Sequence, residues 1–160
     1  MEQQINPESE IAHQMRQLFA DMADSQKEWQ DKIGFGEEGH ALRSEVARRR
    51  GLGLDDPSYQ SAVSNLRNYY MAKMALVMTE VAEATDEFRK HDIGERYYST
   101  DLVESELQKP EGVLSEAADV LIRFWSLFGE AGLGAEFADA IIEKLNYNAN
   151  RAHKHGGKSI

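Results

Sequence analysis

The chain of 160 residues contains no cysteine and only three prolines. The absence of cysteine excludes a disulfide framework, a thiol nucleophile and any zinc or iron–sulfur site that needs cysteine ligands. No apolar run approaches the roughly 18 residues of a membrane-spanning helix, so we expect no membrane segment. Because proline interrupts helices, its scarcity also leaves long stretches of the chain free to be helical.

Positive charge is scarce as well. Lys and Arg number 18 against 28 Asp and Glu, which gives a formal net charge of −10. Proteins that bind nucleic acid or anionic membranes broadly need a basic surface, so this balance argues against both classes of partner. The first ten residues, MEQQINPESE, are acidic and polar, unlike a signal peptide. We therefore expect a cytoplasmic protein. Its negative charge is still compatible with a small anionic ligand if a metal ion holds that ligand.

Apolar residues recur at helical spacing through most of the sequence, which predicts an all-α protein with no β-strand. Expected helices cover about 8–33, 38–50, 57–91, 111–130 and 134–153. Asn6-Pro7 and Asp56-Pro57 are expected helix starts, because each places a capping side chain before a proline. The third helix is long enough to break near Asn68, and 92–109 is expected to be an irregular loop.

Four acidic residues on two of these helices form matching pairs. Glu80 and Glu83 lie three residues apart, and Glu116 and Asp119 repeat the spacing on the next helix. Residues three apart share a helix face, so each pair brings like charges together. At about 4 Å two such charges repel by roughly 4 kcal/mol at an effective dielectric constant near 20. Water on a solvated acidic flank would relieve that repulsion, and so would a bound cation.

The last expected helix carries cationic and amide groups on its apolar side. Lys144, Asn148 and Arg151 project within about 80° of Ile141 at 100° per residue. Burying cations without partners is unfavourable, so these groups either extend into solvent or meet anions. Together with the two acidic pairs they suggest Mg²⁺ or Mn²⁺ bound by carboxylates beside the phosphates of a substrate.

This ordered set of motifs resembles the MazG-like, all-α nucleoside triphosphate pyrophosphatases. The family signature has ExxE on one helix, ExxD on the next, and a Lys, an Asn and an Arg on a following helix. Here it reads Glu80-Val-Ala-Glu83, Glu116-Ala-Ala-Asp119 and Lys144 with Asn148 and Arg151, within about residues 71–158. The resemblance implies a four-helix-bundle-like core with extra short helices in one domain over 1–160. Residues 57–158 would form the catalytic core, and 1–56 would be N-terminal helices without an assigned role.

The resemblance also implies an activity and a role for each site residue. The activity is hydrolysis between the α- and β-phosphates of a (deoxy)nucleoside triphosphate, which gives a monophosphate and pyrophosphate. The four carboxylates Glu80, Glu83, Glu116 and Asp119 would bind Mg²⁺, and a glutamate of the first pair would also orient the attacking water. Phosphate binding would fall to Lys144, Asn148, Arg151 and Lys158, the last closing over the triphosphate on a Gly-Gly hinge. Trp29 would stack on the base unless it is a core or interface residue.

Two further features of the sequence concern its oligomeric state and its resemblance to the family. The helix expected over 111–130 is apolar around more than half of its circumference, wider than the roughly 100° stripe of a surface helix. We expect another chain to bury this wide apolar surface. Members of the family form oligomers, so we expect a homodimer or homotetramer. The 32 residues between Glu83 and Glu116 exceed the family's usual separation, which predicts an added excursion over 94–112 near the site or an interface.

Two other interpretations of the sequence remain open. A catalytically silent helical module that assembles with a partner would also explain the wide apolar arc. A di-iron-like bundle is the second, because Glu10-Ile-Ala-His13 and Glu37-Glu-Gly-His40 both have the ExxH spacing of such sites. Pyrophosphate release and the iron content of the purified protein distinguish these interpretations.

Overall fold

The computed structural model describes residues 4–100 and 108–150 of the chain. These residues form α1 (Glu10–Lys32), α2 (Glu37–Arg49), the 3₁₀ turn η1 (Arg50–Leu52), α3 (Pro57–Phe88), β1 (Tyr97–Thr100), β2 (Gln108–Glu111), α4 (Val113–Ala131) and α5 (Gly134–Ala149). The predicted predominance of helix is confirmed. None of the described helices combines the length and the apolar character that crossing a bilayer demands.

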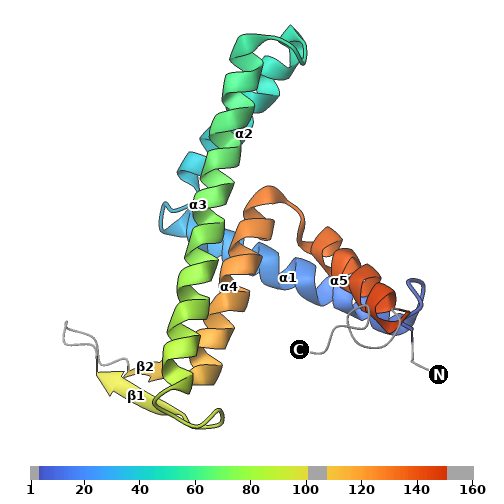
Figure 1. Cartoon of the computed structure of the whole chain (residues 1–160). Helices are drawn as coiled ribbons and strands as arrows, with labels where there is room; N and C mark the ends of the chain where they lie inside the picture. The colour runs from blue at the N-terminus through green and yellow to red at the C-terminus, as the bar shows by residue number, and fades with distance from the viewer. Residues whose placement is uncertain (1–3, 101–107, 151–160) are drawn as a thin grey trace, which may run out of the picture.

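The helices are arranged around the antiparallel pair that α3 and α4 form (Figure 1). α2 runs along the N-terminal half of α3, and α4 packs along its C-terminal half. α1 crosses α4, and α5 packs mainly on α1 rather than on α3. The described part of a single chain therefore leaves one side of the α3–α4 pair without a covering helix, and the MazG-type four-helix bundle stays a prediction.

Helix starts follow the local side-chain chemistry. Asp56 caps α3 by accepting hydrogen bonds from two backbone N–H groups, and Pro57 occupies the first turn, where its missing N–H does no harm. This start is the predicted one. At the other expected start the cap is Ser9, whose hydroxyl accepts from the backbone of Ala12, so α1 begins after the Asn6-Pro7 pair rather than at it.

Two predictions about the middle of the chain are wrong. α3 is one continuous helix of 32 residues, without the break expected near Asn68, because α2 supports one half and α4 the other. Residues 97–100 and 108–111 pair as an antiparallel hairpin with Tyr97 opposite Glu111, inside the segment that was expected to be a loop without strands. The run Tyr-Tyr-Ser-Thr in β1 contains residues that favour strands, a signal too short to register against the helical pattern.

The core lies where α1, α4 and α5 meet. The ring of Phe137 packs on those of Phe19 and Phe128, with centroids 5.6 and 4.3 Å apart. α1 and α4 approach closely because Gly129 has no side chain to separate its backbone from that of Ala23. Ile142 is the one large apolar side chain in the described ranges that is fully buried, so the apolar interior of a single chain is small.

Replacing Gly129 with alanine tests this helix crossing. A Cβ at that position would overlap the backbone carbonyl oxygen of Ala23, so α1 and α4 would have to separate. We expect the free energy of unfolding to fall by about 1–3 kcal/mol, the usual effect of overpacking, in a denaturant titration. Gly51→Ala is the matched control, since a Cβ there meets nothing within 4 Å. Equal stability of the two variants would contradict the close crossing.

Candidate functional site

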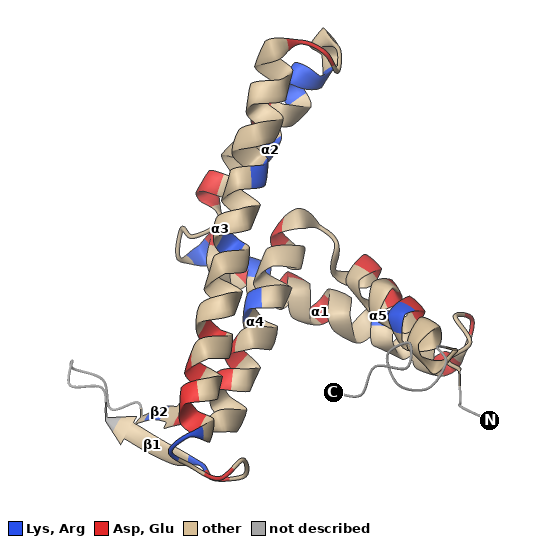
Figure 2. Ribbon diagram, in the orientation of Figure 1, with Lys and Arg blue, Asp and Glu red and all other residues tan. Residues whose placement is uncertain are grey.

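Two acidic pairs face each other across the α3–α4 pair. Glu80 and Glu83 lie in the C-terminal half of α3, and Glu116 and Asp119 lie in the first turns of α4. Because the helices are antiparallel, these two stretches lie side by side, as the adjacent red segments of α3 and α4 show (Figure 2). The structure thus brings together all four carboxylates that the sequence singled out, although 32 residues separate the two pairs.

The four carboxylates line a cavity of about 760 Å³. Its walls come from the end of α1, the start of α2, the facing sides of α3 and α4, and β2. The lining also includes three cations and three aromatic side chains, namely Lys73, Lys109, Arg123, Trp29, Phe35 and Tyr69. Ligand sites for small molecules usually have volumes of about 300–1,000 Å³ and a few convergent polar groups, so this cavity has the size and character of one.

Three of the carboxylates converge closely enough to hold one ion. Glu80, Glu116 and Asp119 each offer a carboxylate oxygen, and these oxygens all lie within 4.8 Å of one another. Within residues 4–100 and 108–150 they are the one group of three or more acidic or histidine side chains with this geometry, and it includes neither His13 nor His40. Oxygen-only donors on rigid helices fit Mg²⁺ or Mn²⁺, which prefer carboxylate ligands and water.

The electrostatics of the cluster show why a cation is favourable there. Burial raises the pKa of the Glu116 carboxyl, and the charges of Asp119 and Glu83 raise it further against the opposing effect of Lys109. Burial likewise raises the pKa of Asp119, and the charge of Glu80 adds to the shift. A raised pKa means that the ionised form is disfavoured in the folded protein. A divalent cation would reverse that preference by stabilising the ionised carboxylates.

Two basic side chains already contact the cluster. Arg123 Nε donates a hydrogen bond to Glu80 Oε1 at 2.8 Å, from the next turn of α4 after Asp119. Lys109 Nζ lies 3.0 Å from Glu111 Oε2 and 4.0 Å from Glu116 Oε1. The hydrogen bond to Glu111 raises the pKa of Lys109, and the charges of Glu116 and Glu83 add to the effect. Lys109 therefore stays charged at the edge of the carboxylate group.

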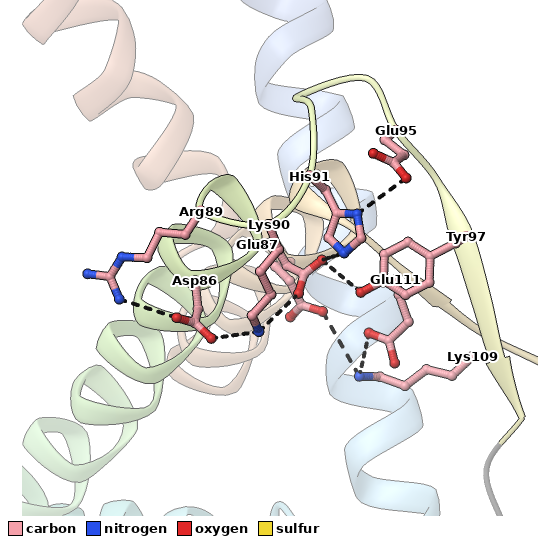
Figure 3. Close-up of polar contacts among 10 residues, drawn as sticks. Asp86, Glu87, Arg89, Lys90, His91, Glu95, Tyr97, Lys109 and Glu111 are labelled. Atoms are coloured by element: carbon pink, nitrogen blue, oxygen red, sulfur yellow. Dashed lines mark hydrogen bonds and ion pairs between the residues drawn. The ribbon is translucent and has the colours of Figure 1, made fainter.

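The hairpin that carries Lys109 is fixed to the end of α3 (Figure 3). Tyr97 Oη donates a hydrogen bond to Glu87 Oε2 at 2.9 Å, and the ring of Tyr97 packs on His91 with centroids 4.7 Å apart. Across the two strands, Ser99 Oγ donates to Glu111 Oε1 at 2.7 Å. The excursion expected near the site is therefore an ordered hairpin over its described residues, and β2 places Lys109 in the cavity wall.

A buried carboxylate contacts two of the residues that line the cavity, Tyr69 and Lys73. Glu130 of α4 is 4% exposed and accepts hydrogen bonds from Arg43 Nη1 at 2.8 Å and from Tyr69 Oη at 2.9 Å. Lys73 Nζ lies 3.6 Å from the same carboxylate. Burial and the hydrogen bond to Glu130 raise the pKa of Tyr69. α2 fits against this group because Gly39 leaves room where a Cβ would overlap Glu130.

One part of the cavity is aromatic. Trp29 is half exposed, and its ring meets that of Phe35 edge to face, with centroids 6.4 Å apart. The neighbouring Gln30 is only 6% exposed, and its Oε1 has no hydrogen-bond partner among the residues that the structure describes. A buried acceptor without a partner is unfavourable, so a ligand that donates a hydrogen bond would stabilise it. The candidate stacking residue Trp29 thus lines the same cavity as the carboxylates.

In a single chain, the predicted phosphate-binding residues of the last helix do not lie beside the carboxylates. Lys144 and Asn148 lie on α5, which packs on α1, and neither side chain lines the cavity. The ammonium of Lys144 lies 5.2 Å from the ring centroid of Tyr147 instead. Arg151 and Lys158 fall outside the described residues.

Several lining residues were not identified as candidates from the sequence. Lys73 and Lys109 carry no motif, since their roles depend on how α3 and the hairpin pack rather than on local spacing. Arg123 was noticeable as the one cation on the polar strip of α4, at helical spacing from Glu116 and Asp119. Gln30 had no signal at all, because nothing local distinguishes a buried amide from an exposed one.

Comparisons with protein-family models, with curated proteins and with solved structures found no match to this chain.

The metal site is tested by thermal denaturation with and without Mn²⁺ or Mg²⁺. A ligand present at about 100 times its Kd stabilises the native state by about 2.7 kcal/mol, so Tm of the wild-type protein should rise by several degrees. Glu116→Gln removes one converging oxygen and should abolish most of that rise. Glu143→Gln, an exposed change on α5, should keep it. A rise of equal size in all three proteins would place the ion elsewhere.

Proposed function

We propose that the protein is a Mg²⁺-dependent nucleoside triphosphate pyrophosphohydrolase, with Mn²⁺ as an alternative ion. The reaction adds water across the α–β phosphoanhydride of a (deoxy)nucleoside triphosphate and releases a monophosphate and pyrophosphate. The observation that carries the proposal is the composition of one cavity, in which converging carboxylates, cations and an aromatic wall occur together. The resemblance to MazG-like pyrophosphatases supports the same reaction, through the motifs that supply these carboxylates.

Glu80, Glu116 and Asp119 would hold the ion, because their oxygens already converge. A bound divalent ion would neutralise phosphate charge and polarise the phosphorus that water attacks. Glu83 is not one of the three converging ligands, so we consider a different role for it. It lines the cavity, is exposed, and makes no hydrogen bond with other described residues, so its carboxylate is free to accept a proton from water. We therefore assign Glu83 as the residue that orients and activates the attacking water.

Phosphate binding is assigned to the cations that reach the cavity. Lys73, Lys109 and Arg123 line it, and the side-chain nitrogen of each lies within 4.0 Å of a carboxylate oxygen. Each cation would contact a phosphate either together with that carboxylate or in place of it. Charge-assisted hydrogen bonds to phosphate oxygens are among the strongest polar contacts in proteins. The roles of Lys144, Asn148, Arg151 and Lys158 remain those implied by the family resemblance.

The nucleoside would occupy the aromatic part of the cavity. Trp29 and Phe35 offer rings for stacking on a base. The partnerless Gln30 Oε1 would accept a hydrogen bond from an amino group on the base edge. Because a site that hydrogen-bonds a substrate group rejects analogues without it, Gln30 would favour amino-bearing bases over those that lack an amino group.

The principal alternative is a catalytically silent helical assembly that uses the same motifs only for packing. The di-iron interpretation has less support, because His13 and His40 are exposed and lie outside the converging group. Pyrophosphate release from the common nucleoside triphosphates with Mg²⁺ distinguishes enzyme from silent module. No release with any of them would contradict the proposal.

Glu83→Gln tests the assignment of the water-activating residue. We expect kcat to fall by about 10²–10⁴-fold, the usual contribution of a general base, measured as pyrophosphate release. The rise in Tm with Mn²⁺ should persist, because Glu83 is not one of the three converging ligands. Glu143→Gln serves as the control and should retain wild-type turnover. Loss of the Tm rise in Glu83→Gln would instead make Glu83 a metal ligand.

Lys109→Ala tests the contribution of the hairpin to substrate binding. Removing one charged hydrogen-bonding group typically costs about 1.5–3 kcal/mol, which corresponds to roughly a 10- to 150-fold rise in KM. Lys27→Ala, which removes a surface lysine of α1 paired with Asp31, should leave KM unchanged. A KM for Lys109→Ala equal to that of wild type would show that the hairpin does not contact the substrate.

A further inference from the structure

Lys73 is the one cation of the cavity whose charged group has no hydrogen-bond acceptor among the described residues. The other two, Lys109 and Arg123, each donate a hydrogen bond to a carboxylate. Lys73 Nζ lies 3.6 Å from Glu130 Oε2 and 5.2 Å from the centroid of the Tyr69 ring, and 3.6 Å is too long for a hydrogen bond. Because its side chain is only 20% exposed, the ammonium group is largely removed from water, and an anion in the cavity would supply the acceptor that it lacks.

Glu130 does not take up the charge of Lys73, because two other groups already satisfy its carboxylate. Arg43 Nη1 donates to one oxygen at 2.8 Å, and Tyr69 Oη donates to the other at 2.9 Å. Burial and the hydrogen bond to Glu130 raise the pKa of Tyr69, which keeps its hydroxyl protonated as a donor. Arginine is always charged in proteins, so one carboxylate lies between two cations and one positive charge remains in excess.

The excess charge is on the cavity side of this group. Lys73 lines the cavity and also an adjoining cavity of about 640 Å³ between α2 and α3, whereas Arg43 and Glu130 line neither of the two. Glu38 also lines both cavities, but it makes no ion pair with Lys73 within 4.0 Å. The ammonium group of Lys73 is therefore the part of the group that a ligand in the cavity would contact.

The position of Lys73 on α3 indicates the form of such a ligand. Lys73 lies seven residues before Glu80 on the same side of the helix, which is about 10 Å along the helix axis. A ligand that contacts both the carboxylate cluster and Lys73 is therefore extended, and it is anionic at the end that Lys73 contacts. A polyphosphate chain whose charge is partly neutralised by a divalent ion at the carboxylates would have this form.

We propose that Arg43 is a positioning residue for substrate binding, which by holding Glu130 leaves the ammonium group of Lys73 free to bind a phosphate. The inference rests on the proposed function, which identifies Lys73 as a phosphate-binding residue. Without Arg43, Lys73 would be the one cation in the described ranges within 4.0 Å of the buried Glu130. A shift of less than about 1 Å would then bring it into a hydrogen bond with Glu130 and away from the ligand. Because Arg43 lies on α2, which approaches Glu130 at Gly39, the packing of α2 determines the charge that the substrate meets.

Binding of inorganic tripolyphosphate in the presence of Mg²⁺, measured by isothermal titration calorimetry, tests the inference without relying on turnover. Arg43→Gln should raise the Kd of tripolyphosphate about tenfold or more, the usual effect of losing a hydrogen bond to a charged group. Arg48→Gln is the matched control, because it removes the same charge from the same helix. Arg48 pairs with Glu45, and neither residue lines the cavity, so this variant should bind like the wild type.

Removing the carboxylate as well distinguishes positioning from a merely structural role of Arg43. In the double variant Arg43→Gln/Glu130→Gln an uncharged amide no longer attracts Lys73, so the Kd should return to within about threefold of the wild-type value. A structural role predicts instead that the double variant binds no better than Arg43→Gln alone. In a Lys73→Gln background, Arg43→Gln should cause no further loss of affinity, since its effect acts through Lys73.

The variants of Glu130 keep the inference testable if Arg43→Gln does not fold. Glu130→Gln and the double variant should each bind tripolyphosphate at least as tightly as the wild type, to within about threefold. A tenfold loss of affinity in either would overturn the inference, as would equal Kd values for Arg43→Gln and the wild type. Failure of the wild type to bind tripolyphosphate would overturn it too.

Pyrophosphate release from nucleoside triphosphates separates this inference from the proposed function. Arg43→Gln should raise KM by about the same factor as the Kd of tripolyphosphate and leave kcat within about threefold, because a contact made equally in the ground state and the transition state affects KM. A fall in kcat at unchanged KM would overturn the inference. Tripolyphosphate binding that weakens in Arg43→Gln without any pyrophosphate release by the wild type would support the role of Arg43 and contradict the proposed function.

Discussion

The convergence of carboxylates between α3 and α4 is the constraint on which the rest of the site depends. Three of their oxygens lie within 4.8 Å of one another, at positions partly removed from water. Each close pair of ionised groups repels by roughly 4 kcal/mol at an effective dielectric constant near 20. The two helices nevertheless pack along most of their shared length, so positive charge has to be supplied to this point. The cations of the chain supply part of that charge, and the proposed divalent ion would supply the rest.

The chain's own cations neutralise the cluster only from its edge. Arg123 pairs with Glu80, and Lys109 is shared between Glu111 and Glu116. No cation in the described ranges makes an ion pair with Asp119 or Glu83 within 4.0 Å. The centre of the carboxylate group therefore has no matching cation among the described residues, which is compatible with the proposed divalent ion. A buried structural ion pair would show the reverse pattern, with every charge matched inside the protein.

The elements of the fold that local spacing determines could be predicted from the sequence. The helix start at Asp56-Pro57, the helix expected over 111–130, and the three-residue spacing within ExxE and within ExxD all follow from patterns within a few residues of one another. The hairpin could not be predicted in this way, because β1 and β2 are each four residues long and depend on partners outside their own strands. The same holds for Lys109 and Glu130, whose roles arise only when distant segments pack.

Placing the charges of α3 and α4 on one side of the pair has two consequences at once. Steps of three and four between Glu80, Glu83 and their counterparts on α4 gather the polar groups of both helices on the cavity side. The same steps leave the other side to methionine, leucine, valine and alanine, which cannot remain in water without loss of stability. A helix pair that carries such a cluster therefore presents an apolar side opposite to it, and the wide apolar arc of α4 in the sequence reflects this separation. In this chain a single pattern of spacing therefore determines both the charged side and the apolar side of the helix pair.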